Sequence, residues 1–96
     1  MYTIELRVGD ETVSRHTIID DAEQCWIAAG LDILPLQGWP AIQLEQDAWY
    51  AQQNLKASPD YYEQVHPEHY VDVLHFLDRV IEGCQDWPEA QVEVTY

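Results

Sequence analysis

The amino-acid sequence predicts an α+β fold with the element order β-β-α-α-α-β, in which a three-stranded sheet is covered by helices. Two observations predict it: apolar and polar residues alternate near both ends of the chain, and apolar residues recur at spacings of three and four between those ends. Because a lone hairpin is only marginally stable in water, we expect the carboxy-terminal strand to join the amino-terminal pair. The length suits a single compact acidic domain over residues 1–96.

The strands are expected over residues 2–8, 12–19 and 91–96. The first and the last alternate apolar and polar side chains, and the middle segment is rich in β-branched residues. Gly9 and Asp10 separate the first two strands, and glycine reaches the positive φ that a tight hairpin turn requires. The first two strands are therefore predicted to form a β-hairpin.

The register of this hairpin stays open at the level of sequence. A loop of two residues sets Leu6 opposite Val13, whereas a loop of four residues sets Val8 opposite Val13. A shift of one residue moves every side chain of a strand to the other face of the sheet. The composition of the two strands does not decide between the two registers.

Two helices are expected between the hairpin and residue 57. Asp20 and Asp21 are predicted to supply the N-cap and the acidic first turn of a short helix that Gly30 ends. A second helix is expected to follow Pro40, with a narrow seam of small and apolar residues on its inner face. The seam consists of Ala41, Leu44, Ala48, Ala51 and Leu55.

The third helix is expected from Pro67 to Glu82, ended by Gly83, after a brief helical turn over residues 61–63. Its core stripe is predicted to be Tyr70, Leu74, Leu77 and Ile81, broadened by Val71, Val73 and Val80. Its opposite face carries Glu68, Asp72, His75, Arg79 and Glu82. We expect this helix to contribute most of the core.

The net charge of the chain limits the classes of ligand that it can bind. With 18 Asp and Glu against 4 Lys and Arg, the formal net charge is −14, which disfavours direct contact with nucleic acid or anionic membranes. No apolar run approaches the roughly 20 residues that span a bilayer, and the first residues lack the pattern of a leader, so we expect a cytoplasmic location. The expected partner is a basic protein surface.

Patterns typical of an enzyme or a metal site are weak. Cys25 and Cys84 stand 59 positions apart outside any CxxC pair, and they are expected to be small buried side chains. In the run from His66 to His69, the intervening proline and the lack of a well-spaced third ligand disfavour metal binding. No nucleophile-elbow or phosphate-loop motif occurs. We therefore expect no catalytic residues, no cofactor and no bound metal.

Acidic and aromatic residues are interleaved from Asp47 to Asp72, and this combination is typical of protein interfaces. The simpler interpretation is a solvated acidic face. We predict that partner binding concentrates on one set of side chains, with the two tyrosines as anchors. The set is Asp60, Tyr61, Tyr62, Glu63, Glu68, Asp72 and Glu82. An acidic edge formed by Asp10, Glu11, Asp20 and Asp21 is the alternative location.

The function hypothesis is a non-catalytic acidic inhibitor of a basic, nucleic-acid-handling protein. Its carboxylates would stand where phosphates lie, as in DNA mimics of the anti-CRISPR or anti-restriction kind that phages and mobile elements carry. The analogy is one of composition, without a matching motif. The alternative is an immunity protein or antitoxin that neutralises a cationic nuclease, and a metal-dependent accessory factor or enzyme ranks third.

Overall fold

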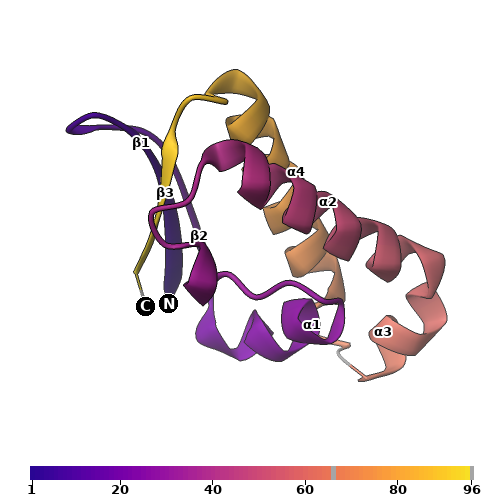
Figure 1. Ribbon diagram of the computed structural model, residues 1–96. Helices are drawn as coiled ribbons and strands as arrows, with labels where there is room; N and C mark the ends of the chain where they lie inside the picture. Colours follow the sequence, from indigo (N-terminus) through magenta and orange to yellow (C-terminus); the bar gives the residue numbers. More distant parts are fainter. Residues whose placement is uncertain (66, 96) are drawn as a thin grey trace.

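The computed structural model describes residues 1–65 and 67–95, and it confirms the α+β class and the three-stranded sheet (Figure 1). The elements in chain order are β1 (Tyr2–Val8), β2 (Glu11–Ile18), the 3-10 turn η1 (Asp20–Ala22), α1 (Glu23–Ala28), the 3-10 turn η2 (Leu34–Leu36), α2 (Ala41–Ala57), α3 (Pro59–Val65), α4 (Tyr70–Asp86) and β3 (Gln91–Thr95). The predicted brief turn before the last helix is a seven-residue helix, α3.

The sheet has the order β2-β1-β3, and both pairs are antiparallel. Val8 pairs with Glu11, so the hairpin loop has two residues, and Gly9 with φ of 63° takes the first loop position of a type II′ turn. A bulge then shifts the register, because Arg7 pairs with Thr12 but Leu6 pairs with Ser14. Neither predicted pairing of Val13 is therefore correct.

The bulge has a physical reason. Without it, a two-residue loop would set Arg15 opposite Ile4, on the face of the sheet that packs on the core. With it, Ile4 pairs with His16 and Arg15 pairs with Glu5 on the outer face. One extra residue thus keeps a guanidinium out of the core.

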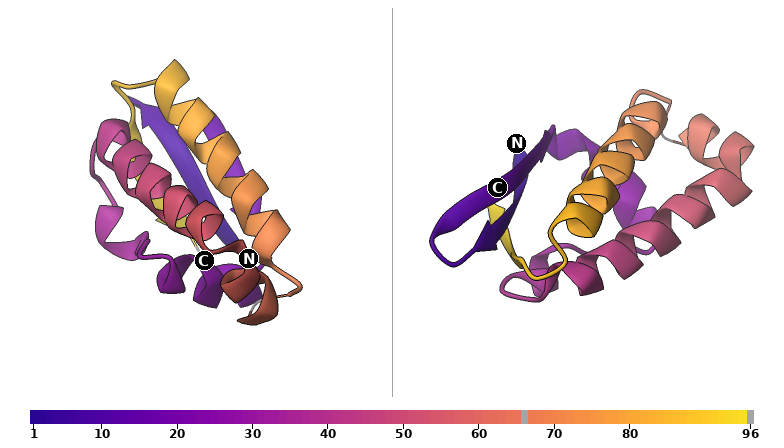
Figure 2. Two further views of the ribbon diagram at one scale, coloured as in Figure 1. Left: turned by 90° about the vertical axis from the view of Figure 1, so that its right-hand side faces the viewer. Right: turned by 90° about the horizontal axis from the view of Figure 1, so that it is seen from above.

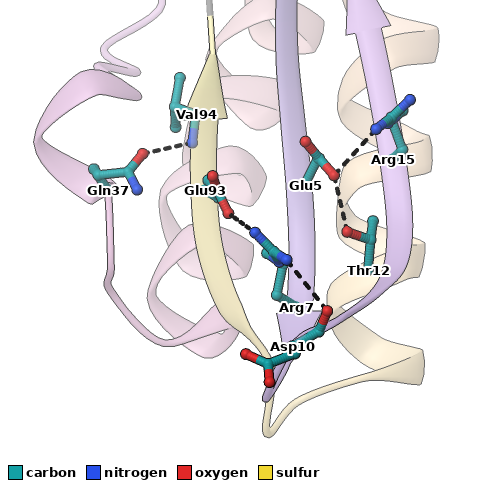
Figure 3. Close-up of polar contacts among 8 residues, drawn as sticks. All are labelled: Glu5, Arg7, Asp10, Thr12, Arg15, Gln37, Glu93 and Val94. Carbon is teal, nitrogen blue, oxygen red and sulfur yellow. Dashed lines mark hydrogen bonds and ion pairs between the residues drawn. The ribbon is translucent and has the colours of Figure 1, made fainter.

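The helices cover one face of the sheet (Figure 2). The other face carries polar side chains, among them the paired Glu5, Arg15 and Glu93. α2 and α4 lie side by side and lead away from the sheet, so the hairpin turn and α3 occupy opposite ends of an elongated molecule of 41 × 23 × 19 Å (Figures 1 and 2). On the polar face, Arg7 donates to Glu93 at 2.7 Å and Arg15 donates to Glu5 at 3.3 Å (Figure 3). Two of the four Lys and Arg side chains are thus paired within the sheet.

The outer edge of β3 is covered by the segment that precedes α2. The amide of Gly38 donates to the carbonyl of Val92 at 2.7 Å, and the amide of Val92 donates to the carbonyl of Trp39 at 2.8 Å. The side-chain oxygen of Gln37 accepts from the amide of Val94 at 2.6 Å (Figure 3). Covering this edge removes backbone groups that would otherwise pair with another chain.

The core is one cluster centred on α4. This helix buries Tyr70, Val73, Phe76, Leu77, Val80, Gly83 and Cys84. Phe76 stacks on Trp26 of α1 with ring centroids 5.9 Å apart, and Trp26 meets Tyr2 of β1 edge to face at 5.2 Å. The predicted stripe is therefore partly wrong: Phe76 belongs to it, whereas Val71 is 53% exposed.

The predicted limits of the last helix are also wrong. His69, with φ of −121°, is the N-cap, so the helix begins at Tyr70 rather than at Pro67. The phenol of Tyr70 donates to the carbonyl of Leu55 in α2 at 3.1 Å, which fixes the first turn against the neighbouring helix. The helix continues through Gly83 to Asp86. The predicted strand end at Tyr96 lies outside the described residues.

Gly83 is helical because α4 approaches β2 closely at this residue. A Cβ atom here would lie 2.8 Å from Ser14 Oγ and 2.9 Å from His16 Nε2, distances that real Cβ atoms essentially never show. Glycine therefore serves close packing at this position, and helix termination is left to Trp87. Gly30, with φ of 98°, follows α1 as the sequence predicted.

The variant Gly83→Ala is expected to lower the free energy of unfolding by about 1–3 kcal/mol, because overpacking outweighs a helix-propensity gain of about 1 kcal/mol. Urea unfolding followed by circular dichroism measures the change. The exposed Gln85→Ala on the same helix is the control, and its expected change is under about 0.5 kcal/mol. A Gly83→Ala variant at least as stable as the wild type would contradict this close packing.

Candidate functional site

An open hollow of about 590 Å³ lies where the start of α1 meets the connection between α3 and α4. We call it the acidic pocket. It is lined by Asp20, Asp21, Glu23 and Gln24 from η1 and α1, and by Val65, Pro67, Glu68 and His69 from the end of α3 and the turn before α4. Four carboxylates from two distant parts of the sequence therefore border one concave surface.

The acidic pocket lies within two acidic stretches of the sequence, which extend beyond the residues that line it. Residues 19–32 and 57–72 together contain eight Asp and Glu and no Lys or Arg. Arg7 and Arg15 are held on the outer face of the sheet, and Lys56 is in the last turn of α2. Asp20 forms an ion pair with the amino group of Met1. Arg79 borders a hollow with Asp72 and Ile19. Neither Lys56 nor Arg79 takes part in an ion pair within the part of the chain that the structure describes.

Two buried tyrosines fix the walls of the acidic pocket. Tyr62 of α3 is 8% exposed, and its phenol donates to the carbonyl of Ala28 at 3.4 Å. Tyr70 ties the start of α4 to α2. Burial raises the pKa of Tyr70, and the charges of Glu63 and Asp60 raise it further, so this phenol remains a hydrogen-bond donor at neutral pH. The pocket is therefore built on anchored helices.

The predicted site residues differ in exposure and in position. Asp60, Tyr61 and Glu63 are exposed on α3, and Glu68 borders the acidic pocket. Tyr62 is part of the core, so of the two predicted anchors Tyr61, at 58% exposure, is the accessible one.

Asp72 and Glu82 lie on α4 and do not line the acidic pocket. Asp72 is in the first turn and borders a separate hollow with Ile19, His75 and Arg79. Glu82 lies about 18 Å along the helix from Tyr70, at about 1.5 Å per residue. The structure thus does not bring Glu82 together with the carboxylates of α3.

Sequence reasoning missed the contribution of Asp20, Asp21 and Glu23 to this surface. The two aspartates were predicted to cap a helix, but η1 has Ile19 as its N-cap and neither η1 nor α1 has a side-chain cap hydrogen bond. The alternative acidic edge is also divided, because the hairpin pairs Tyr2 with Ile18 at one end and Val8 with Glu11 at the other. Asp20 and Asp21 therefore lie far from Asp10 and Glu11.

The chemistry of the remaining polar groups is limited. Within residues 1–65 and 67–95, no group of three His, Cys, Asp or Glu side chains is arranged to hold a metal ion. His66 lies outside the described residues. Burial raises the pKa of Cys84 to about 12, so its thiol is protonated at neutral pH and is a poor nucleophile. Cys25 is also buried and free.

Ser14 and His16 form a hydrogen bond of 2.6 Å, the contact that a serine nucleophile makes with its base. Both side chains lie under α4, where even the Cβ of an alanine at position 83 would come within 3.0 Å of each. Burial lowers the pKa of His16, and the charge of Arg79 lowers it further. On the side that faces Gly83, the pair therefore has no room for a substrate.

Comparison with known proteins gives no match: no family model, no characterised protein sequence and no solved structure is significantly similar to this chain. Among the described helices, none combines the length and apolarity needed to cross a membrane.

The neighbouring tyrosines of α3 are expected to respond differently to truncation. Tyr62→Ala should lower the free energy of unfolding by about 3–5 kcal/mol, because a large buried ring is lost. Tyr61→Ala should cost under about 1.5 kcal/mol, since its edge-to-face contact with Tyr62 at 5.1 Å is the main described interaction that it loses. Urea unfolding of both variants measures this. Equal losses would show that Tyr61 belongs to the core.

Proposed function

We propose that this protein is a non-catalytic acidic inhibitor that binds the basic, nucleic-acid-handling surface of another protein and excludes nucleic acid from it. The observation that supports the proposal is the acidic pocket, whose lining residues include four carboxylates and no Lys or Arg. Carboxylates accept the same charge-assisted hydrogen bonds from Arg and Lys that phosphates accept. In this proposal the protein acts in the cytoplasm, by occupancy alone.

Rigidity supports the same proposal. Three of the four carboxylates of the acidic pocket stand on η1 and α1, and Glu68 lies in the turn before α4. The hydrogen bond of Tyr62 holds α3 to α1, and that of Tyr70 holds α4 to α2. A surface that is ordered before binding loses less conformational entropy when the partner arrives. An anchored acidic wall therefore suits recognition better than a flexible acidic tail.

The magnitude of the net charge also supports a role in binding. Solubility of a small domain needs a net charge of about 2–8 in magnitude, whereas this chain carries −14. The excess destabilises the compact state through self-repulsion. Binding of a basic partner removes that repulsion and offsets its cost.

Neutralising the acidic pocket is expected to weaken partner binding. The partner is first identified by chemical cross-linking in a host lysate and then purified. Asp21→Asn combined with Glu68→Gln should reduce the affinity at least about tenfold, as the loss of charge-assisted contacts at an interface does. Asp10→Asn combined with Glu11→Gln, at the hairpin turn, removes the same charge from the opposite end and should change the affinity less than about twofold.

The same preparations test the mechanism. The association rate of the wild type should fall as salt rises from about 50 to 500 mM, because steering charges are screened, and the inhibitor should displace DNA or RNA from the partner. Equal affinities of the two neutralised variants, or an association rate indifferent to salt, would contradict the proposal. Binding that blocks the partner's active site without displacing nucleic acid would instead indicate an immunity protein.

A further inference from the structure

A second hollow, of about 300 Å³, lies between α2 and the end of α4. We call it the aromatic pocket. It is lined by Glu45, Gln46, Trp49 and Tyr50 of α2 and by Ile81 and Gln85 of α4. The rings of Trp49 and Tyr50 stand 5.3 Å apart at an interplanar angle of 76°. Two aromatic walls, a carboxylate and an aliphatic side chain therefore border one small concave surface.

The rings of Trp49 and Tyr50 are not part of the hydrophobic core. Trp49 is 48% exposed and Tyr50 is 64% exposed, whereas the buried face of α2 is made of other residues. Ile42, one helical turn before Gln46, is 54% exposed and extends the apolar surface. Exposed Trp and Tyr side chains in a concave surface are typical of the energetic centre of an interface.

We propose that the aromatic pocket binds an arginine side chain of the basic partner, an inference that rests on the proposed function. The guanidinium plane stacks on an aromatic wall and donates to the carboxylate of Glu45, while its methylene groups pack on Ile81. Glu45 is only partly exposed, and no ion pair engages it among the residues that the structure describes. Charge and shape thus complement a planar cation.

The chemistry of the pocket favours arginine over an apolar ligand or a lysine. An apolar occupant would bury the Glu45 carboxylate without a partner, which costs free energy. The amide oxygens of Gln46 and Gln85 offer further acceptors for the five N–H donors of a guanidinium. A lysine ammonium is more strongly hydrated and lacks the plane that stacks on a ring.

The aromatic pocket is separate from the acidic pocket. Ile81 lies about 18 Å along α4 from His69, at about 1.5 Å per residue. The two pockets therefore contact different parts of a partner. Engagement of both makes the second contact intramolecular and raises the overall affinity.

The experiment uses a capped Gly-Arg-Gly tripeptide as the probe, titrated to millimolar concentration into the ¹⁵N-labelled protein. We expect shifts of the Trp49 indole signal and of backbone amides around Glu45 and Ile81. The same tripeptide with citrulline in place of arginine keeps the shape but lacks the charge, and it should produce almost no shift. Equal shifts with both peptides, or shifts confined to other residues, would overturn the proposal.

Variants supply the matched controls. Trp49→Ala and Glu45→Gln should each weaken binding of the arginine peptide about fivefold or more, as cation–π and charge-assisted contacts imply. Trp39 is as exposed as Trp49, at 49% against 48%, but does not line the pocket. Trp39→Ala should therefore leave binding unchanged, and an equal loss in both tryptophan variants would overturn the assignment. The amide spectrum of each variant reports that it is folded.

The purified partner separates this inference from the proposed function. If Trp49→Ala leaves partner affinity unchanged while neutralising Asp21 and Glu68 reduces it, the aromatic pocket is not the arginine site and the proposed function stands. If Trp49→Ala reduces partner affinity while neutralising Asp21 and Glu68 does not, the proposed role of the acidic pocket fails and the arginine site stands. A loss in both cases supports both.

Discussion

The close contact of α4 with β2 at Gly83 is the constraint on which the rest of the structure depends. Near the carboxy-terminal end of α4, Gly83 has no Cβ atom, so the helix can lie directly against Ser14 and His16. Further along α4, the ring of Phe76 stacks on Trp26 of α1. At the amino-terminal end of α4, the phenol of Tyr70 donates a hydrogen bond to the carbonyl of Leu55 in α2. Because α4 leads away from the sheet, its first turn stands beside α1 and α3 (Figure 1). The acidic pocket forms at that distal end.

Charge is divided unequally between the two ends of the molecule. On the outer face of the sheet, Glu5 and Glu93 are paired with arginines, and a hydrogen bond from Thr12 together with Arg15 lowers the pKa of Glu5 (Figure 3). Elsewhere Asp47 and Asp78 accept from glutamines. The fold thus uses a minority of its carboxylates in described ion pairs and hydrogen bonds, and those of α3 and the acidic pocket are mostly left to solvent.

Local pattern was enough to predict the strands, the second helix and the hairpin, because alternation and helical spacing are set by residues near in sequence. The bulge opposite Leu6, the helical Gly83 and the exposed Val71 follow from contacts between distant elements, which no local pattern contains. The same holds for the candidate sites: Glu68 and Asp20 border one hollow only because α1 packs beside the start of α4. Burial of Tyr62 beside the exposed Tyr61 is likewise decided by how α3 packs on α1.

The carboxylates of the two acidic stretches, residues 19–32 and 57–72, are claimed not to hold the fold together. Urea unfolding of the wild type at about 20 and 500 mM NaCl tests it, beside a variant with Asp32→Asn, Glu63→Gln and Glu68→Gln, which all lie outside the first turns of α-helices. We predict that salt stabilises the wild type, because it screens self-repulsion, and that the variant is more stable at low salt and gains less from salt. A wild type that salt destabilises, or a variant less stable than the wild type, would contradict the claim.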